Sequence, residues 1–300
     1  MRLREPFLCI ALINLMTTHV LATSEKNPEL EKLLSSGRAA YNRRDFSSAE
    51  SIFKNAKELS KGIGSTGKEL YAHRWLIKSL TAENKIDEAN SSCLEEIEAM
   101  KKFAKRPHYL VEALCDLGYL QIRSNKLKEA EATFDRARSI GNKGDCDNYF
   151  RTEPLEGLAV IRAQQHRLSD AARLYEEALA YVQDNNFDFL SRAALIRSLA
   201  DIYEDQGQSI KAAALYQSVV TNYEKNDEFD QVGIASLFQD FAGFLRRNQR
   251  EEEALSNFRR AFDIYQKYHV KSKAATKCRS DYASLLREMN RADEAKKIED

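Results

Sequence analysis

Apolar and polar residues follow one another along most of this chain in steps of three and four, the spacing that puts apolar side chains on one face of an α-helix. A second, much longer period lies over this short one. Alanines recur every 40 to 42 residues, at Ala49, Ala89, Ala130, Ala171, Ala212, Ala254 and Ala295. A period of that regularity predicts one helical unit repeated along the chain.

Two further columns appear when the units are aligned on those alanines. Mostly aromatic residues lie four positions later, at Phe53, Cys93, Phe134, Tyr175, Tyr216, Phe258 and Glu299. Mostly small residues lie twelve positions earlier, at Gly37, Ile77, Gly118, Ala159, Ala200, Ala242 and Ala283. Small residues let two helix backbones approach closely, and the aromatic ring fills the space beside them. We therefore expect two closely packed helices in every unit.

The two helices of each unit should be joined by a tight turn. The residues at that point are Arg44, Asn84, Asn125, His166, Gly207, Gln249 and Asn290. Asn and Gly best tolerate the left-handed backbone that a helix-to-helix turn needs. Asn27-Pro28 is a good helix start, and we predict similar starts at Pro107 and Pro154, because proline fits the first turn of a helix.

This pattern resembles the tetratricopeptide repeat (TPR). The residues that match its signature are Leu117-Gly118-Tyr119, Ala130, Phe134 and Ala137 in the third unit, and Leu199-Ala200, Tyr203, Gly207, Ala212 and Tyr216 in the fifth. The usual TPR period is about 34 residues, so the longer period here is similar to the kinesin light chain class. The resemblance implies an all-α fold over residues 23–300, a right-handed superhelical α-solenoid of about seven antiparallel helix-turn-helix repeats.

Two units depart from this pattern. In the second, Ile77, Cys93 and Glu96 stand where small or aromatic residues are usual. In the seventh, Glu299 takes the aromatic position and the chain stops at Asp300. We expect less regular packing in the second unit and a short polar capping helix in the seventh, since solenoids need polar ends.

Residues 1–22 have a different pattern. Arg2 and Arg4 precede an apolar stretch over residues 7–16. Val20-Leu21-Ala22 then provides residues that are accepted before a signal-peptide cleavage site. This is the layout of a secretory signal peptide, and the stretch is shorter than the roughly 20 residues of a membrane-spanning helix. We predict cleavage after Ala22 and an exported, periplasmic or secreted protein of bacterial type. An uncleaved membrane anchor is the alternative.

Charge and cysteine content narrow the function further. Lys plus Arg and Asp plus Glu both number 46, so no overall field favours nucleic acid. Export permits disulfides, and a bridge between Cys93 and Cys115 is conceivable, but buried free thiols are the favoured interpretation of these residues and of Cys146 and Cys278. No cysteine or histidine spacing fits a metal motif, and we predict no cofactor, metal or catalytic site.

The TPR resemblance also implies a groove lined by the first helix of each unit. The residues that it places there are mostly basic: Arg38, Asn42, Arg74, Lys78, Tyr119, Arg123, Arg197, Asp201, Arg246, Arg247 and Arg287. Arginine can hold carboxylates bidentately, so an acidic or C-terminal peptide segment of a protein partner is the expected ligand. The alternative is a solvated helix face with internal ion pairs, which Asp201 and Glu204 would supply.

Two functional hypotheses follow. The first is an exported, non-catalytic TPR scaffold that binds a peptide or protein in its partly basic groove. The second is a membrane-anchored envelope assembly factor with an uncleaved N-terminal segment, which binds through its convex face or its ends. The two differ in whether the mature chain begins at Thr23.

Overall fold

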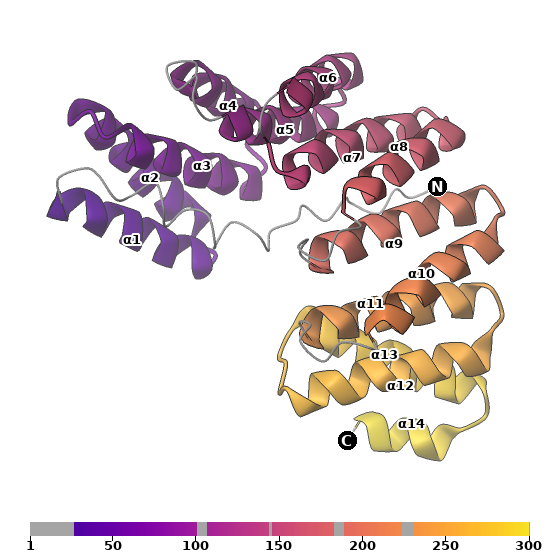
Figure 1. Cartoon of the computed structure of the whole chain (residues 1–300). Coiled ribbons are helices and arrows are strands. Elements are labelled where there is room, and N and C mark those ends of the chain that lie inside the picture. The colour runs from indigo at the N-terminus through magenta and orange to yellow at the C-terminus, as the bar shows by residue number, and fades with distance from the viewer. Residues whose placement is uncertain (1–26, 101–106, 144–145, 183–188, 224–230, 300) are drawn as a thin grey trace. The chain divides into compact units, whose positions relative to one another are not determined.

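The structure is a computed structural model, and it describes residues 27–100, 107–143, 146–182, 189–223 and 231–299. Those residues form helices joined by turns and short connections (Figure 1). The helices in chain order are α1 (Pro28–Asn42), α2 (Phe46–Gly62), α3 (Thr66–Ala82), α4 (Ile86–Met100), α5 (Pro107–Arg123), α6 (Leu127–Lys143), α7 (Asn148–Gln164), α8 (Leu168–Tyr181), α9 (Phe189–Asp205), α10 (Ser209–Tyr223), α11 (Gln231–Arg247), α12 (Glu251–Lys267), α13 (Lys273–Glu288) and α14 (Ala292–Glu299). The predicted signal peptide, residues 1–22, lies outside the described residues.

The chain divides into two compact units, residues 1–161 (unit 1) and 162–300 (unit 2), with the boundary near the end of α7. In unit 1 each helix from α1 to α5 packs against the one that follows it. In unit 2 each helix from α8 to α13 does the same. Each unit is therefore a stack of antiparallel helix pairs, and the all-α solenoid expected from the sequence is confirmed. Among the described helices none is long and apolar enough to cross a membrane.

The predicted turns are confirmed by their backbone geometry. All seven turn residues have a φ between 57° and 71°: Arg44, Asn84, Asn125, His166, Gly207, Gln249 and Asn290. Left-handed backbone is costly for most L-residues and recurs here once per pair, which explains the preference for Asn and Gly. Gly64 and His269 have the same conformation in turns between successive pairs.

The core follows the columns that define the repeat. The recurring alanines all have an exposed fraction of 0%. The ring of Phe134 is equally buried and lies between two glycines, because a Cβ added to Gly118 or Gly157 would lie within 2.6 Å or 2.2 Å of it. Burying such a side chain stabilises the fold by about 1.5–3 kcal/mol. The small column therefore makes room for the aromatic column, as the sequence predicts.

Two of the three expected helix starts are confirmed. Asn27 caps α1, because its Oδ1 accepts a hydrogen bond from the Leu30 N–H at 3.0 Å, and Pro107 is the first residue of α5. The third expectation was wrong, since α7 begins at Asn148 and Pro154 lies inside it. Proline there removes one helical hydrogen bond, but burial of neighbours such as Leu155 keeps the helix continuous.

Candidate functional site

Each unit has a candidate site, its first-helix surface, which is formed by α1, α3, α5 and α7 in unit 1 and by α9, α11 and α13 in unit 2. At Arg74 on α3, the Nη2 donates to Glu112 Oε2 on α5 at 2.5 Å, and the Nε donates to Glu96 Oε1 on α4 at 3.4 Å. Only 14% of the Arg74 side chain is exposed, and the Glu96 side chain is fully buried. Burial alone would lower the pKa of Arg74, but the two carboxylates outweigh it and raise that pKa. Arg74 thus links three helices.

Among the described residues, carboxylates outnumber cations around Arg74. Five of them act on one another or lie beside it, and we call them the carboxylate cluster: Glu96, Glu112, Asp116, Glu153 and Glu156. Burial raises the pKa of Glu96 and of Glu156 to about 8 and that of Asp116 to about 6. Burial also raises the pKa of Glu153, with the neighbouring acids adding to the effect. Part of the cluster therefore retains protons near neutral pH.

Trp75 on α3 lies at the centre of a group of aromatic rings in unit 1. It stacks on the buried Phe53 at a centroid distance of 5.7 Å and meets Tyr41 edge-on at 5.2 Å. The Lys78 Nζ lies 4.7 Å from the centroid of its ring, and the Arg38 Cζ lies 5.9 Å from it. Both distances suit cation–π attraction. Trp75 is half-buried, so it belongs to the core on one side and to the first-helix surface on the other.

In unit 2 the predicted site residues pair with acidic residues from helix to helix. The ion pairs are Arg197–Asp240 at 3.1 Å, Arg247–Glu204 at 2.6 Å, Arg246–Glu288 and Arg287–Glu299. The first three join residues 42 or 43 positions apart, so each links one first helix to the next. Asp201 adds to this network at 3.9 Å from Arg247.

The remaining predicted residues lie on the same surface of unit 1 but do not gather at one point. Asn42 is exposed at the end of α1. Tyr119 on α5 is half-buried and meets the core Phe134 edge-on, with centroids 5.1 Å apart. Arg123 is exposed and donates to Asn84 Oδ1 at 3.1 Å. The structure thus brings together Arg74 and Lys78 with the carboxylate cluster, and Arg38 and Lys78 with Trp75.

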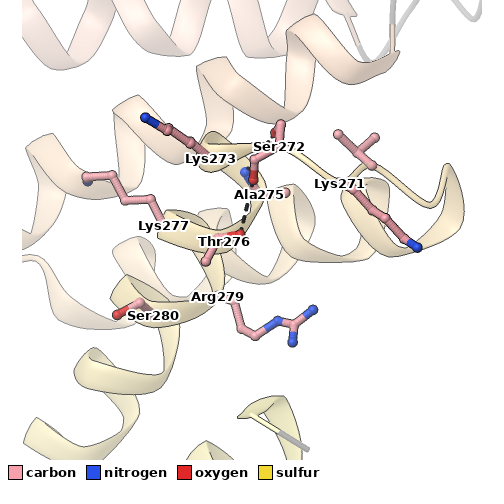
Figure 2. Close-up of a pocket in the computed structure, with 9 residues that line it drawn as sticks. Lys271, Ser272, Lys273, Ala275, Thr276, Lys277, Arg279 and Ser280 are labelled. Carbon is pink, nitrogen blue, oxygen red and sulfur yellow. Dashed lines mark hydrogen bonds between the residues drawn. The ribbon is translucent and has the colours of Figure 1, made fainter. Parts of the chain in front are cut away.

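A separate hollow of about 610 Å³ lies at the start of α13 in unit 2 (Figure 2). Four basic side chains line it: Lys271, Lys273, Lys277 and Arg279. Figure 2 shows Lys273 and Lys277 pointing to one side and Lys271 and Arg279 to the other. Lys277 is also paired with Asp281 at 2.6 Å. The hollow therefore does not gather its positive charges on one anion.

The cysteines have no arrangement that suggests chemistry. All four in the described residues are buried free thiols, Cys93, Cys115, Cys146 and Cys278, as the favoured interpretation holds. Burial raises the pKa of Cys93 and of Cys115 well above the ordinary range, so neither is a ready nucleophile. Within the described parts of the chain, no group of His, Cys, Asp and Glu side chains is arranged to hold a metal ion.

Sequence reasoning missed the carboxylate cluster. One signal was present, since Glu96 occupies a column that otherwise holds small residues such as Ala56 and Ala137, and a charge there must be buried. A second was the spacing of Glu112 and Asp116, four residues apart on one face of α5. The positions that the TPR resemblance places in the groove are mostly basic, but their residue types alone do not reveal their acidic partners.

Comparison with known proteins supports the fold. No family model and no curated protein matches the chain. The solved structure of BtubC from P. vanneervenii aligns with a TM-score of 0.60 at 18% identity, covering 71% of this chain and 91% of that one. Aspartyl phosphate phosphatase F from Bacillus subtilis aligns with a TM-score of 0.64 at 14% identity, covering 90% and 68%. TPR-like repeats of a Podospora anserina kinesin light chain align at 0.53 and 18% identity, covering 67% and 98%.

Identities this low establish the fold alone. Its class is an all-α helical-repeat solenoid. More particularly, the chain has the fold of TPR-like repeat proteins, and the kinesin light chain repeats among its structural neighbours agree with the long period in the sequence.

Proposed function

We propose that this protein is a non-catalytic scaffold that binds a protein or peptide partner on its first-helix surface. The TPR-like fold supports this proposal, because stacked helix pairs present a preformed surface that needs little ordering when a partner binds.

The observation that carries the proposal is the exposed side of Trp75, with Arg38 and Lys78 over its ring. Aromatic and arginine side chains dominate the binding energy of protein interfaces. Cation–π contact holds both basic groups in place and leaves their N–H groups available to an acceptor. The carboxylates of an acidic or C-terminal peptide segment could accept hydrogen bonds from these basic groups. Arg123 extends the same surface along α5.

A capture experiment tests the proposal. Full-length protein and the Arg38→Glu/Arg123→Glu double variant are used as baits in crosslinking capture from the native envelope fraction. Both residues are exposed, so the variant should fold normally. The control is Lys128→Glu/Arg136→Glu on α6, which makes the same charge change at exposed positions of a second helix. A partner lost only with the first variant supports the first-helix surface, and equal recovery with all baits contradicts it.

Export is part of the same proposal. The pattern of residues 1–22 supports a secretory signal peptide and a periplasmic or secreted location. Sequencing the N-terminus of the mature protein tests it, and we expect Thr23 as the first residue. A mature chain that still begins at residue 1 would instead favour the membrane-anchored assembly factor.

The assembly-factor alternative has one observation in its favour. Leu94 on α4 and Ile210 at the start of α10 are large apolar residues with exposed fractions of 54% and 88%, and both lie on second helices. Apolar residues of this size on a surface can mark contacts with another protein. In the capture experiment, a partner lost with Leu94→Ser but kept with Arg38→Glu/Arg123→Glu would support binding through the second helices of unit 1.

A further inference from the structure

Among the residues that the structure describes, the carboxylate cluster of unit 1 has more acidic groups than basic groups acting on it. Its five members come from α4, α5 and α7, whereas the cations that act on it, Arg74 and Lys78, both come from α3. Within the described part of unit 1, the ionisable side chains that interact most strongly with the cluster are Arg74 and Lys78 on α3, Cys93 on α4 and Cys115 on α5. Both thiols are neutral, because burial raises their pKa.

Two oxygen atoms of the cluster have no hydrogen-bond donor. Glu96 Oε2 and Glu153 Oε2 are both buried and unpaired, although the other oxygen of Glu96 meets Arg74 at 3.4 Å. The Glu96 side chain is fully buried beside Arg74. Once ionised, a carboxylate can only accept hydrogen bonds, so both oxygens need a donor when these groups lose their protons. Buried polar atoms without a partner are rare and call for an explanation.

The missing donor is better supplied by an organic cation than by a metal ion. Within the described residues the carboxylates do not converge as metal ligands. Glu96 is fully buried, but Glu112, Asp116, Glu153 and Glu156 are each partly exposed, so a long side chain can reach these four from the first-helix surface. A guanidinium group has five N–H donors in a plane and is weakly hydrated, and it can therefore serve carboxylates on different helices at once.

We propose that the carboxylate cluster binds the guanidinium group of an arginine side chain on the protein partner. This inference rests on the proposed function. It adds that the bound segment contains an arginine as well as acidic groups. The segment would then place acidic groups near Arg38 and Arg123 and an arginine between α5 and α7. The cation replaces protons, because burial raises the pKa of the partly exposed Glu156 to about 8.

The sole tryptophan of the chain provides a direct measurement. Trp75 lies beside Lys78, and the charge of Lys78 interacts with Asp116 of the cluster. The fluorescence of Trp75 should therefore report binding at the cluster. The probes are two otherwise identical Gly/Ser peptides that contain either one arginine or its neutral analogue citrulline, each titrated to millimolar concentration. We expect saturable binding of the arginine peptide alone, with net proton release when calorimetry is done at neutral pH in two buffers of different ionisation enthalpy.

Two variants locate the effect. Glu153→Gln should weaken the arginine peptide about tenfold, the loss of one charge-assisted hydrogen bond, and should reduce the proton release. It keeps the side-chain size and adds no charge, so the folded state is retained. Glu129→Gln on α6 makes the same change at an exposed position and should have no effect.

Three results would overturn the inference: no response to the arginine peptide, equal binding of the citrulline peptide, or unchanged affinity in Glu153→Gln. The capture experiment separates this failure from failure of the proposed function. If Glu153→Gln recovers the native partner as wild type does, while Arg38→Glu/Arg123→Glu loses it, only the arginine site is wrong. If Arg38→Glu/Arg123→Glu recovers the partner as fully as the α6 control does, the proposed function itself fails.

Discussion

The first-helix surfaces of the two units are built from the same repeat but balance their charges differently. In unit 2 each predicted arginine meets an acid of a neighbouring helix, as Arg247 meets Glu204 at 2.6 Å. These pairs are partly exposed, with 38% of the Arg247 side chain accessible. In unit 1 one buried arginine, Arg74, meets two glutamates and faces two further carboxylates, Asp116 and Glu153.

The difference shows that the repeat determines where charged side chains lie, but not whether each of them has a partner of opposite charge. An exposed pair in unit 2 is largely screened by water, and its contribution to stability is small. A buried charge in unit 1 must be compensated within the protein, and removing a partner leaves the rest uncompensated. Unit 1 should therefore be sensitive to charge, to pH and to cationic ligands, and unit 2 much less so.

The largest effect is expected from Arg74→Met, which keeps the bulk of the side chain and removes its charge. Glu96 and Glu112 then lose their cation in a buried site, which should cost about 3–5 kcal/mol in the free energy of unfolding. Urea unfolding followed by far-UV circular dichroism measures it. The loss should be smaller at pH 5 than at pH 8, because the carboxylates can then bind protons. A loss below about 1 kcal/mol at pH 8 would show that Arg74 behaves as a surface charge.

A smaller effect is expected where the helices approach most closely. Gly157→Ala places a Cβ 2.2 Å from the ring of Phe134, which is fully buried and cannot move aside. Overpacking of this kind costs about 1–3 kcal/mol, although alanine recovers part of it through its higher helix propensity. The control is Gly62→Ala at the end of α2, where the added Cβ meets nothing within 4 Å. Equal unfolding free energies for the two variants would contradict the packing of α7 on Phe134.

The pH dependence of stability should reveal the same cluster. Burial raises the pKa of Glu96 and Glu156 to about 8, so the folded chain binds more protons than the unfolded chain at neutral pH, and stability falls as the pH rises. Burial lowers the pKa of His73 to about 4, which opposes this trend only up to its ordinary value of 6.5. Unfolding in urea should therefore show a decline between pH 6.5 and 8. Glu96→Gln should reduce that decline, and an unchanged slope in this variant would refute the assignment.

These outcomes also show what the sequence could predict. Positions such as Ala130, Phe134 and Asn125 follow from helix geometry alone, because each must be small, large or left-handed wherever the repeat is formed. The partners of Arg74 do not follow from it, since the stagger of neighbouring helices decides which acid a long side chain reaches. Pro154 shows the same limit, because the packing of α7 overrides a local preference for a helix start.

The smallest effect is expected from Arg247→Met in unit 2, the counterpart of the change at Arg74. Arg247 holds Glu204 with two hydrogen bonds, at 3.0 and 2.6 Å, and Asn248 donates to the same carboxylate at 3.2 Å. Glu204 therefore keeps a donor when the arginine is removed, and water can reach the exposed parts of the pair. We expect a loss of at most about 1 kcal/mol in the free energy of unfolding, with little change between pH 6.5 and 8. A loss as large as that of Arg74→Met would mean that burial does not explain the different sensitivity of the two first-helix surfaces to loss of an arginine.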